Sequence, residues 1–429
     1  MANTFDLHDI KIKTEQRFHA SQNCLYSNQI EHLHAELLSQ QRCGFVLVAG
    51  LHPGIYSRDH LLAVRFLPKS WTPHFNARKL DDSTLENLIE SELQALRQRK
   101  KMLAAEANEA YRWVHGDADG LPGIVVDDYG EIVVVQSSSH AGDFLLPNLL
   151  SALGRVTDKP IFERSSGQIR ALEKLPERTR WVRAPAPGQK QEEVHTSLAS
   201  LSMIFRPQRC QKTGLFLDQR ENLLLLKKML QSKQSRTMLD LCSYAGAWSC
   251  AAAQAGVVDF TAVDQDKDAL ELCEQNIKNN VTGSASSPNI QLLHGDLFEI
   301  LSKLNREEKS FDVVVADPPA FTKSSKHVPE ARRAYQRLAK LSSRLVSPNG
   351  LLVACSCSRH IGEEDFYEIV SSALIADDWV YLGRGRQSPD HTVLATDKHS
   401  LYLKALFFVR RSSLAHFSQA QVNRRGENP

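Results

Sequence analysis

The 429-residue sequence lacks the features that define several large protein classes. It has no uncharged apolar run of about 18 residues, the minimum for a membrane-spanning helix, and no apolar signal-peptide core at its N-terminus. Its eight cysteines include no pair with metal-finger spacing. GxGxxG and GxxxxGK motifs are also missing, which disfavours dinucleotides and nucleoside triphosphates as ligands. We therefore predict a soluble cytoplasmic protein with reduced cysteines, no metal and no membrane partner.

The sequence also lacks an excess of charge of one sign, since its formal net charge is only +2. Such a balance leaves nucleic acid open as a partner, because the local clustering of basic residues decides binding. Two basic clusters, RQRKK (Arg97–Lys101) and Arg332–Arg333, are candidate phosphate contacts. A charge run is also commonly a solvated surface, so both readings stay open.

The residue pattern divides the chain into four parts. Residues 1–78 carry short β-like runs (FVLVAG, LLAVRFL), which indicate a small β-rich module. Residues 79–206 form a central α+β domain, with a helix from Asp82 to about Ala110 capped by Ser83 and two strands, IVVD and EIVVVQ, in a hairpin-rich region. Residues 207–413 form the third part, and residues 414–429 a flexible tail.

In the third part, apolar strands alternate with amphipathic helices. This rhythm predicts a doubly wound, Rossmann-like α/β sheet. Seven strands are expected, the last two forming an antiparallel hairpin because no full helix separates them. The expected helices are near Trp248–Gln254, Lys267–Asn279, Leu297–Leu304, Pro329–Leu345 and Glu363–Ile375.

Acidic residues stand at the ends of the first three of these strands. Asp240 precedes a small-residue turn with Ser243 and Gly246, and a glycine there lets a ligand approach the backbone closely. Asp264 is placed to accept both hydroxyls of a ribose, and Asp296 lies where an adenine amino group would be read. A single such aspartate is often only a helix cap, but the series fits S-adenosylmethionine, an adenosine ligand without phosphates.

The next two strands end in groups with complementary chemistry. VVVADPPAFT places Asp317 after an apolar strand, and LLVACSCS places Cys357 after the following one. Adjacent ends of parallel strands form one ligand crevice, so a carboxyl group that can hold a ring edge would lie beside a thiol that can attack it. A buried apolar thiol is the alternative for Cys357, and Cys355, inside the strand, is expected to pack.

Eight segments together resemble one family, the large-subunit ribosomal RNA cytosine-C5 methyltransferases of class I that carry an N-terminal PUA-like module. The resemblance covers about Arg112 to Arg410 and is weak before Leu85. Its most specific string is KTGLFLDQR. The segments are GDADGLPGIVVDDYG, KTGLFLDQRENL, LDLCSYAGAW, VDQDKDALELCEQN, GDLFEIL, FDVVVADPPAF, ACSCS and DHTVLATDKHSLYLKAL.

The resemblance implies methylation at C5 of a cytosine in 23S rRNA, with S-adenosylmethionine as cofactor. Cys357 would add to C6 of the base, because C5 alone is a poor nucleophile, and Asp317 would hold the base. Arg220 would bind the cofactor's carboxylate or pair with Asp218, and Tyr244 would pack beside the cofactor or in the core. The expected cofactor-binding residues are Lys212, Thr213, Asp218, Arg220, Asp240, Ser243, Tyr244, Gly246, Asp264, Asp296, Asp317 and Pro318.

The sequence departs from the family pattern at two positions. Ala320 stands where lysine is common after DPP, with Lys323 three residues later, and Ala247 stands where a second glycine is usual. His391 is a further candidate for RNA binding, and a homodimer is a candidate assembly. Two rival functions remain: a related guanine-N methyltransferase of ribosomal RNA without a covalent step, and a non-catalytic RNA-binding assembly factor.

Overall fold

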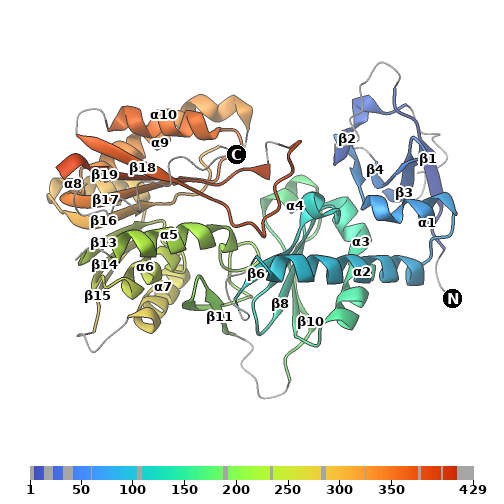
Figure 1. Cartoon of the computed structure of the whole chain (residues 1–429), viewed down its shortest axis with the longest axis horizontal. Helices are drawn as coiled ribbons and strands as arrows, with labels where there is room; N and C mark the ends of the chain where they lie inside the picture. The colour runs from blue at the N-terminus through green and yellow to red at the C-terminus, as the bar shows by residue number, and fades with distance from the viewer. Residues whose placement is uncertain are drawn as a thin grey trace. The chain divides into compact units, whose positions relative to one another are not determined.

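The computed structural model describes residues 4–13, 23–31, 42–58, 60–103, 109–186, 192–231, 235–281, 287–322, 324–374, 378–397 and 400–412. Lys323 and the predicted tail at 414–429 lie outside this part of the chain. Two compact units make up the protein (Figure 1). Unit 1 comprises Met1–Val194, Arg206–Gly214 and Pro389–Ser400, and unit 2 comprises His195–Phe205, Leu215–Ser388 and Leu401–Pro429. The domain boundaries drawn from the sequence at 78 and 206 stay predictions.

Unit 1 begins with a five-stranded sheet of order β1-β3-β4-β5-β2. The strands β1 and β3 are parallel and the other neighbours antiparallel. The apolar runs FVLVAG and LLAVRFL supply β3 and β5, as their β-like pattern predicts, while the PUA-like assignment remains a prediction. The bounds are β1 (Leu7–Ile10), β2 (Cys24–Tyr26), β3 (Cys43–Val48), β4 (His52–Ser57) and β5 (Leu62–Phe66), with η1 (Ser27–Gln29), η3 (Lys69–Trp71) and α1 (Thr72–Asn76) beside them.

The amphipathic helix α2 (Asp82–Lys101) follows. Its N-cap is Asp81, whose carboxylate accepts a hydrogen bond from the Thr84 backbone N–H at 2.8 Å, so the predicted cap Ser83 is wrong. The helix ends at Lys101 and not near Ala110. Its apolar face, with Leu85, Ile89, Leu93 and Leu96 buried, packs in one core with α3.

A second five-stranded sheet of order β10-β9-β8-β7-β6 completes the regular structure of unit 1. The predicted hairpin of IVVD and EIVVVQ is confirmed, because β7 and β8 pair antiparallel. The strands β8 and β9 are parallel since α3 connects them. The bounds are β6 (Tyr111–His115), η4 (Gly116–Asp119), β7 (Ile124–Asp128), β8 (Val133–Ser137), α3 (His140–Val156), β9 (Ile161–Ser165), α4 (Gln168–Leu172) and β10 (Arg178–Arg183).

Unit 2 is built on a seven-stranded sheet of order β15-β14-β13-β16-β17-β19-β18. The strands from β15 to β17 run parallel, and β19 is antiparallel to both β17 and β18. A two-stranded hairpin, β11 (Val194–Leu198) and β12 (Leu201–Phe205), precedes it. The bounds are β13 (Thr237–Leu241), β14 (Asp259–Asp264), β15 (Asn289–His294), β16 (Phe311–Ala316), β17 (Val346–Ser356), β18 (Trp379–Arg386) and β19 (Lys404–Arg410).

Helices cover both faces of this sheet, as the predicted Rossmann-like α/β fold requires (Figure 1). One face carries α5 (Arg220–Leu230), α6 (Ala247–Gln254) and α7 (Lys267–Asn280), and the other carries α8 (Leu297–Arg306), α9 (Val328–Ser343) and α10 (Glu363–Ala373). Short turns of η5 (Leu217–Gln219) and η6 (Ser325–His327) precede α5 and α9. Among the described residues, no helix is long and apolar enough to cross a membrane.

Candidate active site

The turn from β13 to α6 has an unusual backbone. Cys242 and Tyr244 have φ angles of 62° and 46°, a region that side chains other than glycine rarely occupy, and Gly246 has 79°. A Cβ on Gly246 would lie 2.6 Å from Cys273 Sγ, so the turn packs directly on α7. The Gly246 N–H donates to Ser243 O at 2.8 Å. Residues with such sparsely populated backbone conformations are often found in ligand-binding segments.

Asp240, at the end of β13, is fully buried beneath this turn. Its Oδ2 accepts hydrogen bonds from the Ser249 backbone N–H at 3.2 Å and from Ser249 Oγ at 2.7 Å. Its buried Oδ1 has no partner among the described residues. Burial raises the pKa of Asp240 to about 7, with the Ser249 bonds opposing and Asp317 and Asp264 adding to the rise. A ligand that brings a donor or a positive charge would satisfy this carboxylate.

The other acidic residues of the predicted series lie around the same turn. Asp264 Oδ2 accepts the Tyr244 N–H at 2.8 Å, and its Oδ1 accepts the Asp266 N–H at 3.0 Å. Burial raises the pKa of the Cys242 thiol, and the charges of Asp264, Asp317, Asp240 and Asp296 raise it further. All four carboxylates of the series thus act on the pKa of one thiol in the β13–α6 turn.

Asp296 also has the plainer role that the sequence left open. Its Oδ1 accepts the backbone N–H groups of Phe298 at 2.9 Å and Glu299 at 3.1 Å, which makes it the N-cap of α8. By contrast, Asp264 is not a cap, because Asp266 caps α7.

Asp317, directly after β16, is held by two residues that the sequence interpretation did not assign to it. Gln219 Nε2 donates to Asp317 Oδ2 at 2.8 Å, and Trp248 Nε1 donates to the same oxygen at 3.0 Å. Both donors stand in segments of the family resemblance, LFLDQR and YAGAW, which is the only signal the sequence offers for them. Pro318 beside it is buried and Pro319 exposed.

The KTGLFLDQR segment passes from one unit to the other between Gly214 and Leu215. In unit 1, Thr213 Oγ1 donates to Asp127 Oδ2 at 2.5 Å, and Lys212 has a φ of 49°. The structure therefore places Lys212 and Thr213 in a different unit from the other predicted cofactor residues.

The unit 2 part of this segment is buried. Asp218 Oδ2 accepts a hydrogen bond from Tyr402 Oη at 2.6 Å. Arg220 begins α5 and is fully buried. Tyr244 packs against Phe216 with ring centroids 5.0 Å apart, the aromatic packing that the sequence allowed as an alternative to cofactor contact.

Cys357 lies one residue beyond β17 in a turn that is fastened from two sides. From α9, Tyr335 Oη accepts the Ser356 hydroxyl hydrogen bond at 3.0 Å and lies 3.0 Å from Ser358 Oγ. From β19, Lys404 Nζ donates to Ser358 O at 2.6 Å and Ile361 O at 2.8 Å. Neither Tyr335 nor Lys404 was identified from the sequence. The half-buried thiol of Cys357 therefore stands on a rigid base.

The two neighbouring cysteines differ in their surroundings. Cys355 is almost fully buried inside β17, and burial raises the pKa of its thiol well above the ordinary value, with the charges of Asp317 and Cys357 adding to the rise. Only the thiolate form is nucleophilic. Cys357, outside the strand and partly exposed, is the better candidate nucleophile.

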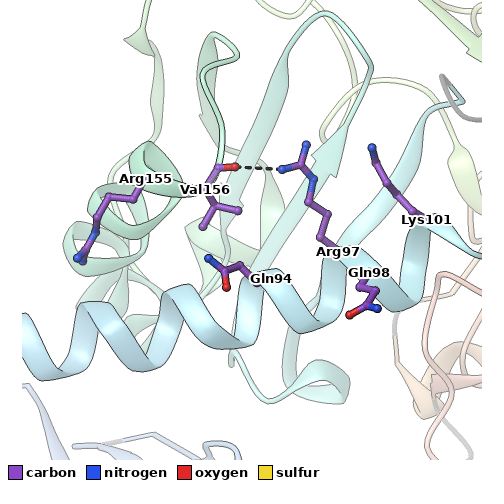
Figure 2. Close-up of a pocket in the computed structure, with 6 residues that line it drawn as sticks. All are labelled: Gln94, Arg97, Gln98, Lys101, Arg155 and Val156. Atoms are coloured by element: carbon purple, nitrogen blue, oxygen red, sulfur yellow. Dashed lines mark hydrogen bonds between the residues drawn. The ribbon is translucent and has the colours of Figure 1, made fainter.

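The basic cluster on α2 (Arg97–Lys101) contains both buried and exposed side chains. A pocket of about 390 Å³ in unit 1 is lined by Gln94, Arg97, Gln98, Lys101, Arg155 and Val156 (Figure 2). Lys100 instead points to the interior, where its Nζ lies 3.0 Å from Asp119 Oδ2. Arg99 pairs with Glu92. Of the four basic residues in the RQRKK cluster, only Arg97 and Lys101 line the pocket.

The remaining candidate RNA contacts are engaged with protein groups. Arg332 pairs with Asp365 at 3.0 Å and Arg333 with Glu330 at 3.3 Å. His391 is buried in unit 1, with Nδ1 3.0 Å from Asp390 Oδ1, and this burial does not fit an RNA contact.

Comparison with known proteins gives the site a context. The profile of the S-adenosylmethionine-dependent methyltransferase family matches residues 145–409. A Methanocaldococcus jannaschii protein, provisionally named a ribosomal RNA large subunit methyltransferase, is 34% identical over 70% of this chain and 74% of its own. Ribosomal RNA large subunit methyltransferase I of Klebsiella pneumoniae is 29% identical over 82% of this chain and 84% of its own.

Two solved structures share the fold. A candidate S-adenosylmethionine-dependent methyltransferase of Streptococcus mutans aligns with a TM-score of 0.71 at 20% identity, over 94% of this chain and 99% of its own. A methyltransferase candidate complexed with SAH aligns with a TM-score of 0.70 at 19% identity, over 94% of this chain and 100% of its own.

Proposed function

The chain belongs to the S-adenosylmethionine-dependent methyltransferase family, and on that premise we propose that it methylates C5 of a cytosine in large-subunit ribosomal RNA through an adduct with Cys357. The names of its relatives support the RNA substrate. The observation that carries the proposal is the position of Cys357, a partly exposed thiol directly after β17, which pairs with β16, the strand directly before Asp317.

The cofactor fits the residues at the β13–α6 turn. S-adenosylmethionine, when bound, supplies an electrophilic methyl group on a cationic sulfur. The fully buried Asp240, with an oxygen that no described group satisfies, suits a ligand that carries positive charge and N–H donors. Asp264, at the adjacent strand end, is positioned for the ribose hydroxyls. Ser243, Tyr244 and Gly246 form the strained turn above them.

Cys357 would perform the nucleophilic step. Its thiolate adds to C6 of the cytosine, the electron pair moves toward C5, and C5 becomes nucleophilic enough to take a methyl group. Loss of the C5 proton to a base then restores the ring and expels the thiolate. The fastened turn around Ser356 and Ser358 keeps the sulfur in one place, and such positioning supports attack at a ring carbon.

Asp317 would hold the cytosine ring edge. Two donors on one carboxylate oxygen, from Gln219 and Trp248, fix the plane of this group. A fixed carboxyl group can bind N3 or the amino group of the base at a constant distance from the sulfur of Cys357. The side chain of Trp248 therefore links the start of α6 to the substrate end of the site.

The α2 pocket would contact the RNA backbone through Arg97 and Lys101. Arg97 Nη1 donates to Val156 O at 3.0 Å, and the guanidinium lies 5.2 Å from the centre of the Trp113 ring, so its charge is held in a fixed place. Arg155 in the same pocket is neutralised by Glu86 and Glu90. A phosphate group suits this pocket, because its oxygens can accept hydrogen bonds from the two cations and from the two glutamine amides.

Replacing both Arg97 and Lys101 by glutamine should weaken RNA binding and lower the magnitude of its salt slope by roughly 1 to 2, since about two phosphate contacts are lost. Fluorescence anisotropy of a labelled ribosomal RNA fragment at several salt concentrations measures this. The matched control is the double glutamine variant of Arg332 and Arg333, whose charges are already paired. Equal slopes for the two double variants would contradict the assignment.

The experiment that tests the proposed reaction is Cys357→Ala, with Cys355→Ala as the matched control. We expect Cys357→Ala to abolish methyl transfer from labelled S-adenosylmethionine to ribosomal RNA while cofactor binding persists. RNA containing 5-fluorocytosine should form a stable adduct with the native protein, because fluorine cannot leave C5 as a proton does. Retained transfer by Cys357→Ala would exclude the covalent route and favour the guanine-N alternative. Absence of cofactor binding by calorimetry would favour the assembly-factor alternative.

A further inference from the structure

Lys404 is the first residue of β19 and pairs in register with Ser356, the residue before Cys357. Its side chain is almost completely buried, which is rare for lysine unless the ammonium group has partners. From this placement we infer that Lys404 is a positioning residue, which fixes the turn carrying Cys357 and stabilises its thiolate form. The inference rests on the proposed role of Cys357 as the nucleophile.

The geometry supports the first half of this role. Lys404 Nζ donates to Ser358 O at 2.6 Å and to Ile361 O at 2.8 Å, so one ammonium group bonds the chain on the C-terminal side of Cys357 twice. An ammonium group has three N–H donors. Two are used on these carbonyls, which belong to the first and the fourth residue after Cys357.

Electrostatics support the second half. Burial lowers the pKa of Lys404 to about 8, and the charge of Cys357 opposes this by raising it. The same attraction acts in reverse, because a nearby ammonium group favours the thiolate over the thiol. Lys404 is thus a buried cation bonded to the turn that follows Cys357.

Among the described residues, the following groups on the elements near Cys357 differ from Lys404 in charge or in burial. Tyr335 from α9 is a buried phenol whose pKa is raised by burial. Cys355 from β17 is a buried thiol whose pKa is raised further by Asp317, a charge that disfavours a thiolate. Arg386, opposite Lys404 on β18, is exposed, and the exposed Arg359 lies over the Tyr402 ring at 5.8 Å.

The reaction uses a sulfur anion twice. Before addition, the thiolate provides the electron pair of the S–C6 bond, and at elimination the same pair returns to sulfur as that bond breaks. A fixed ammonium group stabilises the negative charge on sulfur before addition and after elimination, and it keeps its own proton in both steps. The proton lost from C5 goes to a different group, because an ammonium group has no lone pair with which to accept it.

The test measures the thiol directly, without RNA or turnover. Alkylation of Cys357 by iodoacetamide, followed peptide by peptide with mass spectrometry across pH 5–10, gives the pKa of the reacting thiol. In the native protein we expect a midpoint below the ordinary value of about 8.5. Lys404→Met should raise the midpoint by about one unit or more and slow alkylation at pH 7 about tenfold. Lys404→Arg, which keeps the charge, should restore the lower midpoint.

Lys340→Met, at an exposed lysine on α9, is the matched control and should leave the midpoint unchanged. A native midpoint at or above about 8.5 overturns the inference even if Lys404→Met fails to fold. An unchanged midpoint in a Lys404→Met protein that still binds S-adenosylmethionine also overturns it, as does a Lys404→Arg midpoint equal to that of Lys404→Met. These outcomes are separate from failure of the proposed function, which shows as methyl transfer by Cys357→Ala.

Discussion

At the scale of single residues, Asp240 shows how burial prepares a side chain for a ligand. Its carboxyl group is held on one oxygen by Ser249, lies fully buried, and has a pKa raised to about 7. Without a ligand, this residue is therefore largely protonated below neutral pH. A cationic ligand shifts the balance toward the ionised form, because opposite charges lower the pKa of a carboxyl group.

This coupling predicts that S-adenosylmethionine binds more tightly as pH rises from 6 to 8. At pH 6 the protein must release a proton to bind the cofactor, whereas at pH 8 Asp240 is already ionised, so the dissociation constant should fall about tenfold. Calorimetry in two buffers of different ionisation enthalpy measures both the affinity and the proton release. Asp240→Asn should bind more weakly with a flatter pH profile. An identical profile in native and variant proteins would refute the coupling.

At the scale of elements, the β13–α6 turn decides how closely strand, helix and ligand can approach. Three of its residues have left-handed backbones, and Gly246 has no room for a side chain against Cys273. Gly256, at the end of α6, also has a positive φ of 98°, but no atom lies within 4 Å of where its Cβ would be. A side chain at Gly256 would therefore meet backbone strain alone, whereas one at Gly246 would meet both backbone strain and crowding.

Gly246→Ala is therefore expected to destabilise unit 2 by about 2–4 kcal/mol, through overpacking against Cys273 in addition to the left-handed backbone. Gly256→Ala should cost only about 1 kcal/mol, because only the backbone is affected. Urea unfolding followed by circular dichroism gives both values, and cofactor calorimetry should show weaker binding for Gly246→Ala alone. Equal losses in the two variants would mean that crowding at Gly246 is unimportant.

The sequence predicted elements well where periodicity was strong. The helices expected at Lys267–Asn279 and Pro329–Leu345 occur at Lys267–Asn280 and Val328–Ser343, because their apolar faces repeat at helical spacing. The end of α2 was placed too late, since helical propensity continues in the residues after Lys101. Its cap was misplaced because Asp81, Asp82 and Ser83 all suit that position.

The site was predicted in part, for a physical reason. Strand ends are visible in a sequence, so Asp240, Asp264, Asp317 and Cys357 could be named from it. Residues that act through long-range contacts were not visible. Trp248, Tyr335 and Lys404 reach the site through packing of α6, α9 and β19, and the sequence alone contains no sign of which partner each one meets. Charge clusters were similarly ambiguous, since RQRKK contains both the buried Lys100 and the exposed Lys101.

At the scale of the whole molecule, unit 1 is assembled from three separate stretches of chain. Its buried charges depend on the last stretch. Asp390 is fully buried, accepts the Arg112 backbone N–H at 2.9 Å and lies 3.0 Å from His391 Nδ1. Lys100 Nζ donates to Asp390 O at 2.5 Å and to Thr392 Oγ1 at 2.6 Å. Residues near position 390 thus complete a core begun at position 100.

Asp390→Ala is expected to destabilise unit 1 by about 3 kcal/mol, because it leaves buried polar groups without an acceptor. Hydrogen exchange of the β6 peptide, which contains Arg112, reports on this unit and should become about a hundredfold faster. Asp378→Ala is the control, since that exposed aspartate pairs with Arg411 at the surface and should cost less than about 1 kcal/mol. Equal exchange in the two variants would show that the buried Asp390 carboxylate does not stabilise unit 1.

The three-stretch composition of unit 1 has a consequence for protein synthesis. Translation produces residues 4–186 long before it produces Asp390 and Thr392. Until then, the ammonium group of Lys100 in the nascent chain lacks these two hydrogen-bond partners. The N-terminal sheets can form early, but the final structure around Lys100 and Arg112 closes only after most of unit 2 has been made. A chain that ends before position 390 would therefore lack the acceptors of Lys100 and of the Arg112 backbone N–H, and we expect its first unit to stay incompletely closed.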